Sequence, residues 1–319
     1  MDFAAIRKSL ARWYGRNRRD LPWRRTGDPY AIWISEIMLQ QTRVAAVVPY
    51  FERFLAKFPD AASLAAASET EVLGLWSGLG YYSRARNLRI AARKIVDSGG
   101  FPADYSAIRQ LPGIGAYTSA AIASIAFGLP YAVVDGNVRR VVARLANDAD
   151  ADTQAVADEL LDPKQPGRSN QALMELGALI CLPREPLCGI CPVATNCGAH
   201  RQGTQADLPR PHPKPDPVHL KRTLLLIRQR GKVLLAPGVR VQGFWDLPEP
   251  FPAARLEKRL GNFRHAILHR HYSFEVREGS TARAPRGMRW FHMDKLADIP
   301  LSTMARKALQ VAAPHKLTA

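Results

Sequence analysis

Prolines at every second position interrupt the chain between residues 209 and 217. The segment "DLPRPHPKPDPV" contains Pro209, Pro211, Pro213, Pro215 and Pro217. A helix and a central strand both need backbone N–H groups that proline lacks, so neither can continue through this segment. We therefore expect an extended, polyproline-like connector. With 319 residues, the chain is long enough to form a domain on each side of it.

The two sides of this connector differ in pattern. Before it, apolar residues recur at spacings of three and four, as in Val44, Val47, Val48, Phe51 and Phe54, which is typical of helices. After it, "KRTLLLIRQRGKVLLAP" predicts a hairpin, "HYSFEVR" and "GMRWFHM" favour strands, and a helix is expected near 302–311. We predict an all-α domain at 1–200, a Pro-rich linker at 201–217 and an α+β domain at 218–319.

The chain is strongly basic. It has 45 Lys and Arg against 28 Asp and Glu, a formal charge of +17. From Val218 onward there are 19 basic and 7 acidic residues, so +12 of this charge lies in the smaller domain. Such an excess favours a polyanionic partner, with nucleic acid as the leading candidate, although a merely soluble basic protein has the same composition.

No segment is expected to enter a membrane. The N-terminal "MDFAAIRKSLARWYGRNRRD" lacks the sustained apolar core of a signal peptide. The uncharged segment 113–134 is interrupted by Gly128 and Pro130 and predicts a buried helix followed by a turn. We expect a cytoplasmic protein.

All four cysteines lie in "CLPREPLCGICPVATNC". Cys181, Cys188, Cys191 and Cys197 are separated by six, two and five residues. Because disulfides are rare in the cytoplasm, the clustering indicates a metal site. Zinc sites usually bring two close pairs with a long spacer, whereas one close pair with two single cysteines suits a [4Fe–4S] cluster. Zinc and, last, unliganded buried cysteines remain alternatives.

A Gly-x-Gly turn precedes an apolar helix in "LPGIGAYTSAAIASIAF". Gly113 and Gly115, with Ile114 between them, free the backbone to present N–H groups at the helix start, where a phosphate oxygen binds well. A lone Gly-x-Gly is more often an ordinary helical corner. In a basic all-α domain it favours a hairpin that grips a DNA backbone without reading sequence.

These motifs together carry a family resemblance. "LPGIGAYT", "VDGNVRRV" at 134–141 and the cysteine spacing resemble the endonuclease III superfamily of helix-hairpin-helix DNA glycosylases. "LPWR", "SEIMLQQT", "GLGYYSRARNL" and "MELGA" make the chain similar to the MutY family, adenine DNA glycosylases that remove adenine mispaired with 8-oxoguanine. The resemblance is dense over 10–200.

The resemblance implies a function and its partners. It implies a monofunctional glycosylase of base excision repair that flips adenine out of double-stranded DNA at A:8-oxoguanine or A:G mispairs, and leaves an abasic site. It also implies a helix-hairpin-helix domain whose loop 181–197 carries a [4Fe–4S] cluster. We expect a monomer in the bacterial cytoplasm, associated with the nucleoid through DNA.

Glu36 is the expected catalytic acid. It lies in "PYAIWISEIMLQQTRV", a predicted helix with Asp28 as N-cap and Pro29 at its first position. One turn away lie Ile32, Trp33 and Leu39, which would desolvate the carboxyl and raise its pKa. The resemblance implies that Glu36 protonates N7 of the adenine and later helps to activate water.

Three further residues are expected at the reaction centre. Without the resemblance, an Asp135 followed by Gly136 would be typical of an ordinary helix N-cap. The resemblance implies that Asp135, with Asn137 beside it, stabilises the cationic sugar. Tyr117 occupies the position where the bifunctional branch has a nucleophilic lysine, so a Schiff base is not expected.

The resemblance also assigns residues that bind the bases and the backbone. Trp23, Arg24, Leu39 and Glu175 are expected around the adenine, and Gln41, Thr42 and Tyr81 at the opposite base or in the stack. For Trp23 and Tyr81, plain core packing is the alternative. Expected backbone contacts are Gly113, Ile114, Gly115 and Arg139, together with Arg84, Arg86 and Arg89, which would otherwise form a solvated helix face.

The C-terminal domain resembles the Nudix-like module that checks for 8-oxoguanine, with "GFWDLPE" as its clearest trace. No Glu-rich Nudix box follows, so a pyrophosphate hydrolase is not expected. Where the family commonly has Phe-Ser-His, this chain has Ile267, Leu268 and His269. Leu268 has no donor or acceptor, so His269 is the expected contact with the opposite base.

Functions of other classes remain to be tested. A bifunctional pyrimidine glycosylase and lyase would need an amine where Tyr117 stands. A non-catalytic DNA-binding iron–sulfur protein would not need the two carboxylates. An electron-transfer protein would leave the charge and the hairpin unexplained.

Overall fold

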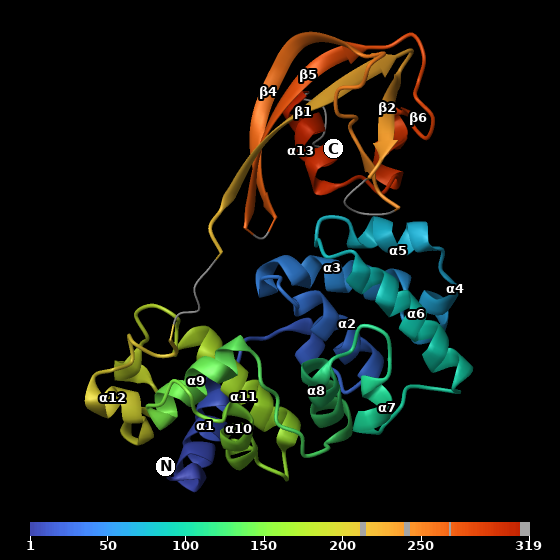
Figure 1. The fold of residues 1–319 in the computed structure, drawn as a ribbon. Helices are drawn as coiled ribbons and strands as arrows, with labels where there is room; N and C mark the ends of the chain where they lie inside the picture. Colours follow the sequence, from blue (N-terminus) through green and yellow to red (C-terminus); the bar gives the residue numbers. More distant parts are fainter. Residues whose placement is uncertain (211–214, 239–242, 268, 313–319) are drawn as a thin grey trace. The chain divides into compact units, whose positions relative to one another are not determined.

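The computed structural model describes residues 1–210, 215–238, 243–267 and 269–312 (Figure 1). Contacts divide the chain into two compact units, Met1–Ala66 with Asn87–His212 and Ala67–Arg86 with Pro213–Ala319. This division differs from the predicted domains, because residues 67–86 group with the C-terminal part. Pro211 and Pro213 of the predicted linker lie outside the described residues.

The first unit is helical, and no strand occurs among residues 1–210. The all-α prediction is therefore confirmed. The elements up to residue 202, with α5 and the start of α6 belonging to the second unit, are α1 Phe3–Asn17, η1 Pro22–Arg24, α2 Pro29–Leu39, α3 Val44–Lys57, α4 Ala61–Ala66, α5 Glu69–Trp76, α6 Ser83–Asp97, α7 Tyr105–Arg109, α8 Ala116–Phe127, α9 Gly136–Ala146, α10 Thr153–Leu160, α11 Pro166–Leu179, η2 Cys188–Ile190, η3 Ala194–Asn196 and α12 Gly198–Gln202.

Helix α2 begins where the sequence predicted. The Asp28 carboxylate accepts hydrogen bonds from the N–H groups of Tyr30 and Ala31, and Pro29 occupies the first turn. Every residue from Tyr30 to Met38 is buried, including Glu36. Because α2 contacts both α3 and α8, it is an interior helix with no solvated face at its centre.

Helices α9 and α11 approach closely at Gly177. A Cβ atom at this position would lie 2.6 Å from the Cβ of Asn137, so a larger residue would force the helices apart. Apolar residues of α1, α9, α10 and α11 form one core cluster of this unit. The start of α9, with Asp135 and Asn137, is thus fixed against α11 by packing.

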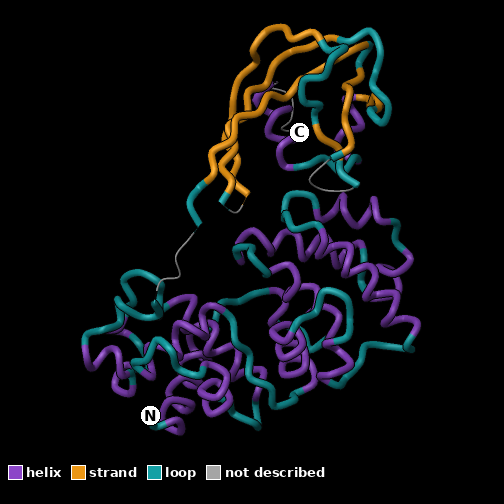
Figure 2. Tube along the Cα trace, viewed as in Figure 1, coloured by secondary structure: helices purple, strands orange, loops and turns teal. Residues whose placement is uncertain are grey.

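The second unit is built on a mixed sheet (Figure 2). The strand order is β3-β2-β1-β5-β4, β6 pairs with β2, and only β1 and β5 run parallel. The α+β prediction is confirmed. The elements are β1 Val218–Gln229, β2 Lys232–Pro237, β3 Trp245–Asp246, β4 Arg255–Ile267, β5 Arg270–Ser280, β6 Arg289–His292, η4 Met293–Asp298 and α13 Thr303–Ala312.

The predicted hairpin and terminal helix are both present. Arg230 and Gly231 have positive φ values of 49° and 74° and form the tight turn between β1 and β2. Helix α13 begins one residue after the predicted start and packs on β4 over one face of the sheet (Figure 1).

Residues 67–86 pack with the C-terminal part through specific contacts. The Tyr82 and Phe244 rings lie 3.9 Å apart between centroids. The Ser77 hydroxyl donates a hydrogen bond to the Leu301 carbonyl at 3.2 Å. The sequence showed only a helical pattern here, because pairings across more than 160 positions leave no periodicity to read.

No helix in the described part of the chain is both long enough and apolar enough to cross a membrane.

Removing the cap of α2 should destabilise the first unit. Asp28→Ala leaves two N–H groups of the helix start without their carboxylate partner, and we expect a loss of about 1 kcal/mol in the free energy of unfolding. Urea denaturation followed by circular dichroism measures it. Asp28→Ser keeps an acceptor and should recover most of the loss; equal stability of Asp28→Ala and wild type would contradict the capping role.

Candidate functional site

A cavity of about 240 Å³ lies among the helices of the first unit. It brings together most of the catalytic and base-binding residues predicted from the sequence. The lining residues are Arg19, Leu21, Trp23, Arg24, Glu36, Leu39, Thr42, Val44, Tyr117, Asp135, Asn137, Gln171, Met174, Glu175 and Ala178. They come from segments more than 150 positions apart, which is why the sequence alone could not assemble them.

Glu36 lies at this cavity with only 6% of its surface exposed. The pKa of its carboxyl is raised from 4.5 to about 7, and burial is the largest cause. A hydrogen bond from Tyr117 and the charge of Arg24 lower this pKa, whereas the negative Asp135 raises it. A carboxyl with this pKa is partly protonated at neutral pH and can donate a proton.

Tyr117 connects α8 to Glu36. Its hydroxyl donates a hydrogen bond to Oε2 of Glu36 at 3.0 Å and lies 3.6 Å from the sulfur of Met174. Burial raises the pKa of Tyr117 well above its usual value. The phenol therefore stays neutral, and it offers a proton donor where a nucleophilic amine would be needed for a Schiff base.

Asp135 is the N-cap of α9, so the cap interpretation is correct as geometry. One carboxylate oxygen accepts from the Val138 N–H at 2.7 Å, and the other from the Asn137 side chain at 3.0 Å. The Asn137 oxygen in turn accepts from Arg140 at 2.8 Å. The same carboxylate lines the cavity with Glu36, so capping and a place at the site are compatible.

Glu175 is almost fully enclosed by two arginines. Its carboxylate accepts five hydrogen bonds, three from Arg19 and two from Arg24. Although burial alone would raise the pKa of Glu175, these bonds lower it to about 2. The carboxylate thus stays ionised beside the cavity and fixes the guanidinium of Arg24.

Sequence reasoning missed two lining residues that contact the predicted ones. Arg19 donates to Glu175, and Met174 lies against the Tyr117 hydroxyl. Met174 precedes Glu175 in "MELGA", so the motif offered a local signal. Arg19 offered none beyond its charge, because its partner is 156 positions away.

The other predicted base-binding residues of the first unit differ in position. Trp23 is buried edge-on against Phe51, with ring centroids 5.4 Å apart, and also lines the cavity, so it serves as core and wall at once. Leu39 and Thr42 line the cavity. Gln41 is exposed, outside the cavity wall, and adopts a positive φ of 57°.

Tyr81, Arg84 and His269 belong to the second unit. Tyr81 is half exposed and has a positive φ of 49°. Arg84 is buried between the rings of Trp76 and Tyr81, so the alternative of a solvated helix face fails for this residue, and its phosphate contact stays a prediction. The His269 carbonyl accepts from the Val218 N–H, whereas Leu268 lies outside the described residues.

The Gly-x-Gly turn has the geometry expected of a helical hairpin. Gly113 has a φ of +81°, and a Cβ there would lie 2.7 Å from the Cβ of Asn87. Gly115 is the N-cap of α8, and no side chain caps the N–H groups at the start of this helix. Those groups are left for solvent or an anion. Arg139, on the neighbouring α9, is exposed.

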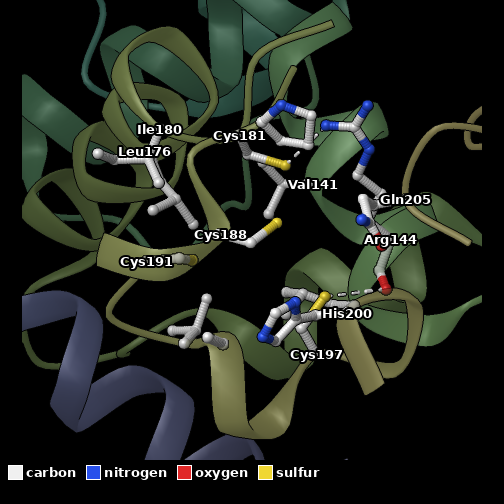
Figure 3. Close-up of a pocket in the computed structure, with 14 residues that line it drawn as sticks. Val141, Arg144, Leu176, Ile180, Cys181, Cys188, Cys191, Cys197, His200 and Gln205 are labelled. Atoms are coloured by element: carbon white, nitrogen blue, oxygen red, sulfur yellow. Dashed lines mark hydrogen bonds between the residues drawn. The ribbon is translucent and has the colours of Figure 1, made fainter. Parts of the chain in front are cut away.

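The four cysteines line one cavity with apolar walls (Figure 3). Arg144, buried at its edge, donates to the Cys181 sulfur at 3.3 Å, and the Cys197 thiol donates to the Arg144 carbonyl. Among the described residues, no three His, Cys, Asp or Glu side chains converge on a single ion position. The thiols thus share a space without meeting at one point.

Comparison with known proteins gives consistent matches. Residues 34–166 match the family model described as HhH-GPD superfamily base excision DNA repair protein. Adenine DNA glycosylase of Mus musculus is 33% identical over 99% of this chain and 79% of its own length. The enzyme of Homo sapiens is 47% identical over 65% of this chain, and that match covers 41% of the human protein. The chain thus spans less than half of the human relative.

Two solved structures each match more than three fifths of the chain. A thermostable thymine-DNA glycosylase has 30% sequence identity and a TM-score of 0.59, covering 63% of this chain and 97% of that chain. A non-covalent endonuclease III–DNA complex has 22% identity and a TM-score of 0.55, over 62% of this chain and 95% of that one. The second match supports the fold alone.

The raised pKa of Glu36 should make stability depend on pH. Its stabilising contribution is complete below its unfolded pKa of 4.5 and is lost as pH rises through about 7, because folding then buries a charge. Relative to wild type, Glu36→Gln should therefore gain up to roughly 3 kcal/mol in free energy of unfolding between pH 4.5 and 8. Urea denaturation across this range measures the difference.

The matched control is Glu159→Gln, which removes an exposed carboxylate from the same unit. A Glu36→Gln difference that stays constant with pH would show that the carboxyl titrates normally.

Proposed function

This chain belongs to the adenine DNA glycosylase family of base excision repair, and from that premise we propose that it excises adenine opposite 8-oxoguanine or guanine. It acts as a monofunctional enzyme that leaves an abasic site. The observation that carries the proposal is the pairing of Glu36 with Tyr117 in a cavity that also contains Asp135. The flipped adenine occupies this cavity.

Glu36 supplies the proton that the leaving base needs. With a pKa of about 7, it is protonated in a large fraction of molecules near neutral pH. Transfer of that proton to N7 of the adenine weakens the glycosidic bond, because the base then leaves as a neutral species. The resulting carboxylate activates water for attack on the sugar.

Asp135 stabilises the sugar as positive charge develops on it. Its carboxylate is held by Val138 and Asn137, so it is oriented before the substrate arrives. Tyr117 keeps Glu36 in place and offers no amine for covalent attack. The chemistry therefore ends at base loss without strand scission.

Glu175 acts on the adenine mainly through Arg24. Five hydrogen bonds from Arg19 and Arg24 leave its carboxylate little capacity to accept more. Arg24, fixed in this way, donates to acceptor nitrogens of the base. Trp23 and Leu39 form apolar walls on which the ring packs.

DNA is held by the hairpin and checked by the second unit. The uncapped start of α8, with Gly113, Ile114 and Gly115, binds a backbone phosphate, and Arg139 contributes a second contact. Gln41 and Thr42 contact the opposite base, and Tyr81 wedges into the stack. The C-terminal part, 218–319, is a Nudix-like module whose segment 267–269 reads that base through His269. The protein works as a monomer in the bacterial cytoplasm, at the nucleoid.

The cysteine loop 181–197 holds a [4Fe–4S] cluster. Each iron of such a cube takes one thiolate, so four sulfurs around one cavity fit it better than a zinc ion, whose ligands converge at about 2.3 Å. When bound, the cluster cross-links the loop through its metal–thiolate bonds. Arg144 ties the loop to α9 through the Cys181 sulfur and the Leu182 carbonyl.

Base loss should occur without strand breakage. With a duplex that contains one adenine opposite 8-oxoguanine, we expect strand breaks only after hot alkali, because the product is an intact abasic strand. Glu36→Gln should lower the single-turnover rate at least about hundredfold, since the proton donor is removed. Denaturing gels with and without alkali measure both effects.

Wild-type activity should also fall above about pH 7, where Glu36 loses its proton. Glu159→Gln should cleave like wild type. Breaks without alkali would indicate a lyase, and retention of adenine by the wild-type protein would refute the proposed activity.

The cysteine loop should contain iron and sulfide. The purified protein is expected to absorb broadly in the blue and to release four irons per chain, and Cys191→Ala should lose most of both. Iron and zinc analysis with visible spectroscopy measures this. Stoichiometric zinc with no visible absorbance would overturn the cluster assignment.

A further inference from the structure

The sheet of the second unit is covered unevenly. Leu224, Leu226 and Phe274 point to one face and pack in the core beneath α13. Leu225 and Ile227 point to the other face and pack against the segment that contains Phe251 and the one that contains Trp290. These segments cover the half of the second face that contains Leu225 and Ile227. Among the described residues, nothing comparable packs on the half toward Val218, where Lys221 and Ser273 are exposed.

This open half forms a cavity of about 750 Å³ on β1, β5 and β4. Strand pairing places Lys221, Ser273 and Arg264 side by side on one row, and Thr223, Glu275 and Asn262 on a second row on the same face. We call these two rows the open sheet face. All six side chains are polar, and each row presents one residue from each strand.

The charge of the open sheet face is positive and largely unneutralised. Its two nearby acids already have arginine partners, since Glu249 pairs with Arg222 at 3.9 Å and Glu275 with Arg277 at 3.3 Å. Within the described residues, no ion pair involves Lys221, Arg264 or the adjoining Arg259, which also lines the cavity. A lysine and an arginine therefore flank the Ser273 hydroxyl with their charges available.

The chemistry of this face points to phosphate. Cations that flank a hydroxyl match the oxygens of a phosphate diester. The two rows contain no aromatic ring on which a base could stack, so they favour the backbone over the bases. The row with Arg264 lies three residues before Ile267, the last residue of β4, about 10 Å along the strand, so the face reaches the end of β4.

We propose that the open sheet face binds sugar-phosphate backbone of the DNA, with Lys221 and Arg264 as the phosphate contacts and Ser273 between them. This inference rests on the proposed action on DNA, and it extends the expected backbone contacts beyond the helical hairpin. In this proposal one DNA strand is bound at two places: His269 contacts the opposite base, and the open sheet face contacts the phosphates that follow it.

The double variant Lys221→Gln with Arg264→Gln tests the proposal in the full chain. Each lost phosphate contact reduces the slope of log affinity against log salt by about 0.9, so the double variant should lose about 2 from that slope. Its fall in affinity between about 50 and 200 mM salt should be about tenfold smaller than that of wild type. Fluorescence anisotropy with an undamaged duplex measures this.

A charge-matched control lies elsewhere in the same unit. Arg283→Gln with Arg286→Gln removes two exposed arginines outside the open sheet face and should keep a larger part of the wild-type slope. The single variant Ser273→Glu places a negative charge at an exposed site between the two cations. It should weaken DNA binding, and most strongly at low salt, where charges are least screened. A wild-type slope for the Lys221 and Arg264 double variant, or equal losses in both double variants, would overturn the proposal.

Adenine release at saturating enzyme separates this inference from the proposed function. The double variant should release adenine at the wild-type single-turnover rate, because no residue of the face lines the catalytic cavity. If wild-type protein released no adenine, the proposed function would fail. The slopes of log affinity against log salt would still decide whether the open sheet face binds the DNA backbone.

Discussion

The burial of one carboxyl group, that of Glu36, is the constraint on which the catalytic unit depends. A charged glutamate in the interior helix α2 would be costly, so the surroundings must favour its protonated form and still provide a partner. Tyr117 provides that partner from α8. The cap at Asp28 and the turn at Gly113 position the two helices that make this contact, α2 and α8.

Two glutamates at the same cavity have pKa values shifted in opposite directions because their surroundings differ. Glu36 has a pKa of about 7 because burial outweighs a single hydrogen bond. Glu175 is at least as buried, yet its pKa is about 2 because two arginines surround it. One residue can thus donate a proton while the other anchors a cation, and in the proposed function this separates acid catalysis from base binding.

The second unit contains proposed recognition residues from two separate parts of the sequence. The segment 67–86, which carries Tyr81, packs with the C-terminal part through the Tyr82–Phe244 contact. The candidate wedge therefore shares a compact unit with segment 267–269. The open sheet face extends the same unit with free cations. Opposite-base reading, stacking and backbone binding would then be mechanically linked.

The sequence by itself determined the local features of this protein. It specified the all-α and α+β parts, the start of α2 at Asp28, the Arg230–Gly231 turn and the position of every cysteine, because capping, periodicity and turn chemistry act over a few residues. It also predicted Glu36 and Asp135 as site residues through motifs, and both line one cavity. Only the tertiary structure decided that Arg19 encloses Glu175, that residues 67–86 join the second unit and that half of one sheet face stays open. Those outcomes depend on contacts between distant segments, and packing alone selects which of them form.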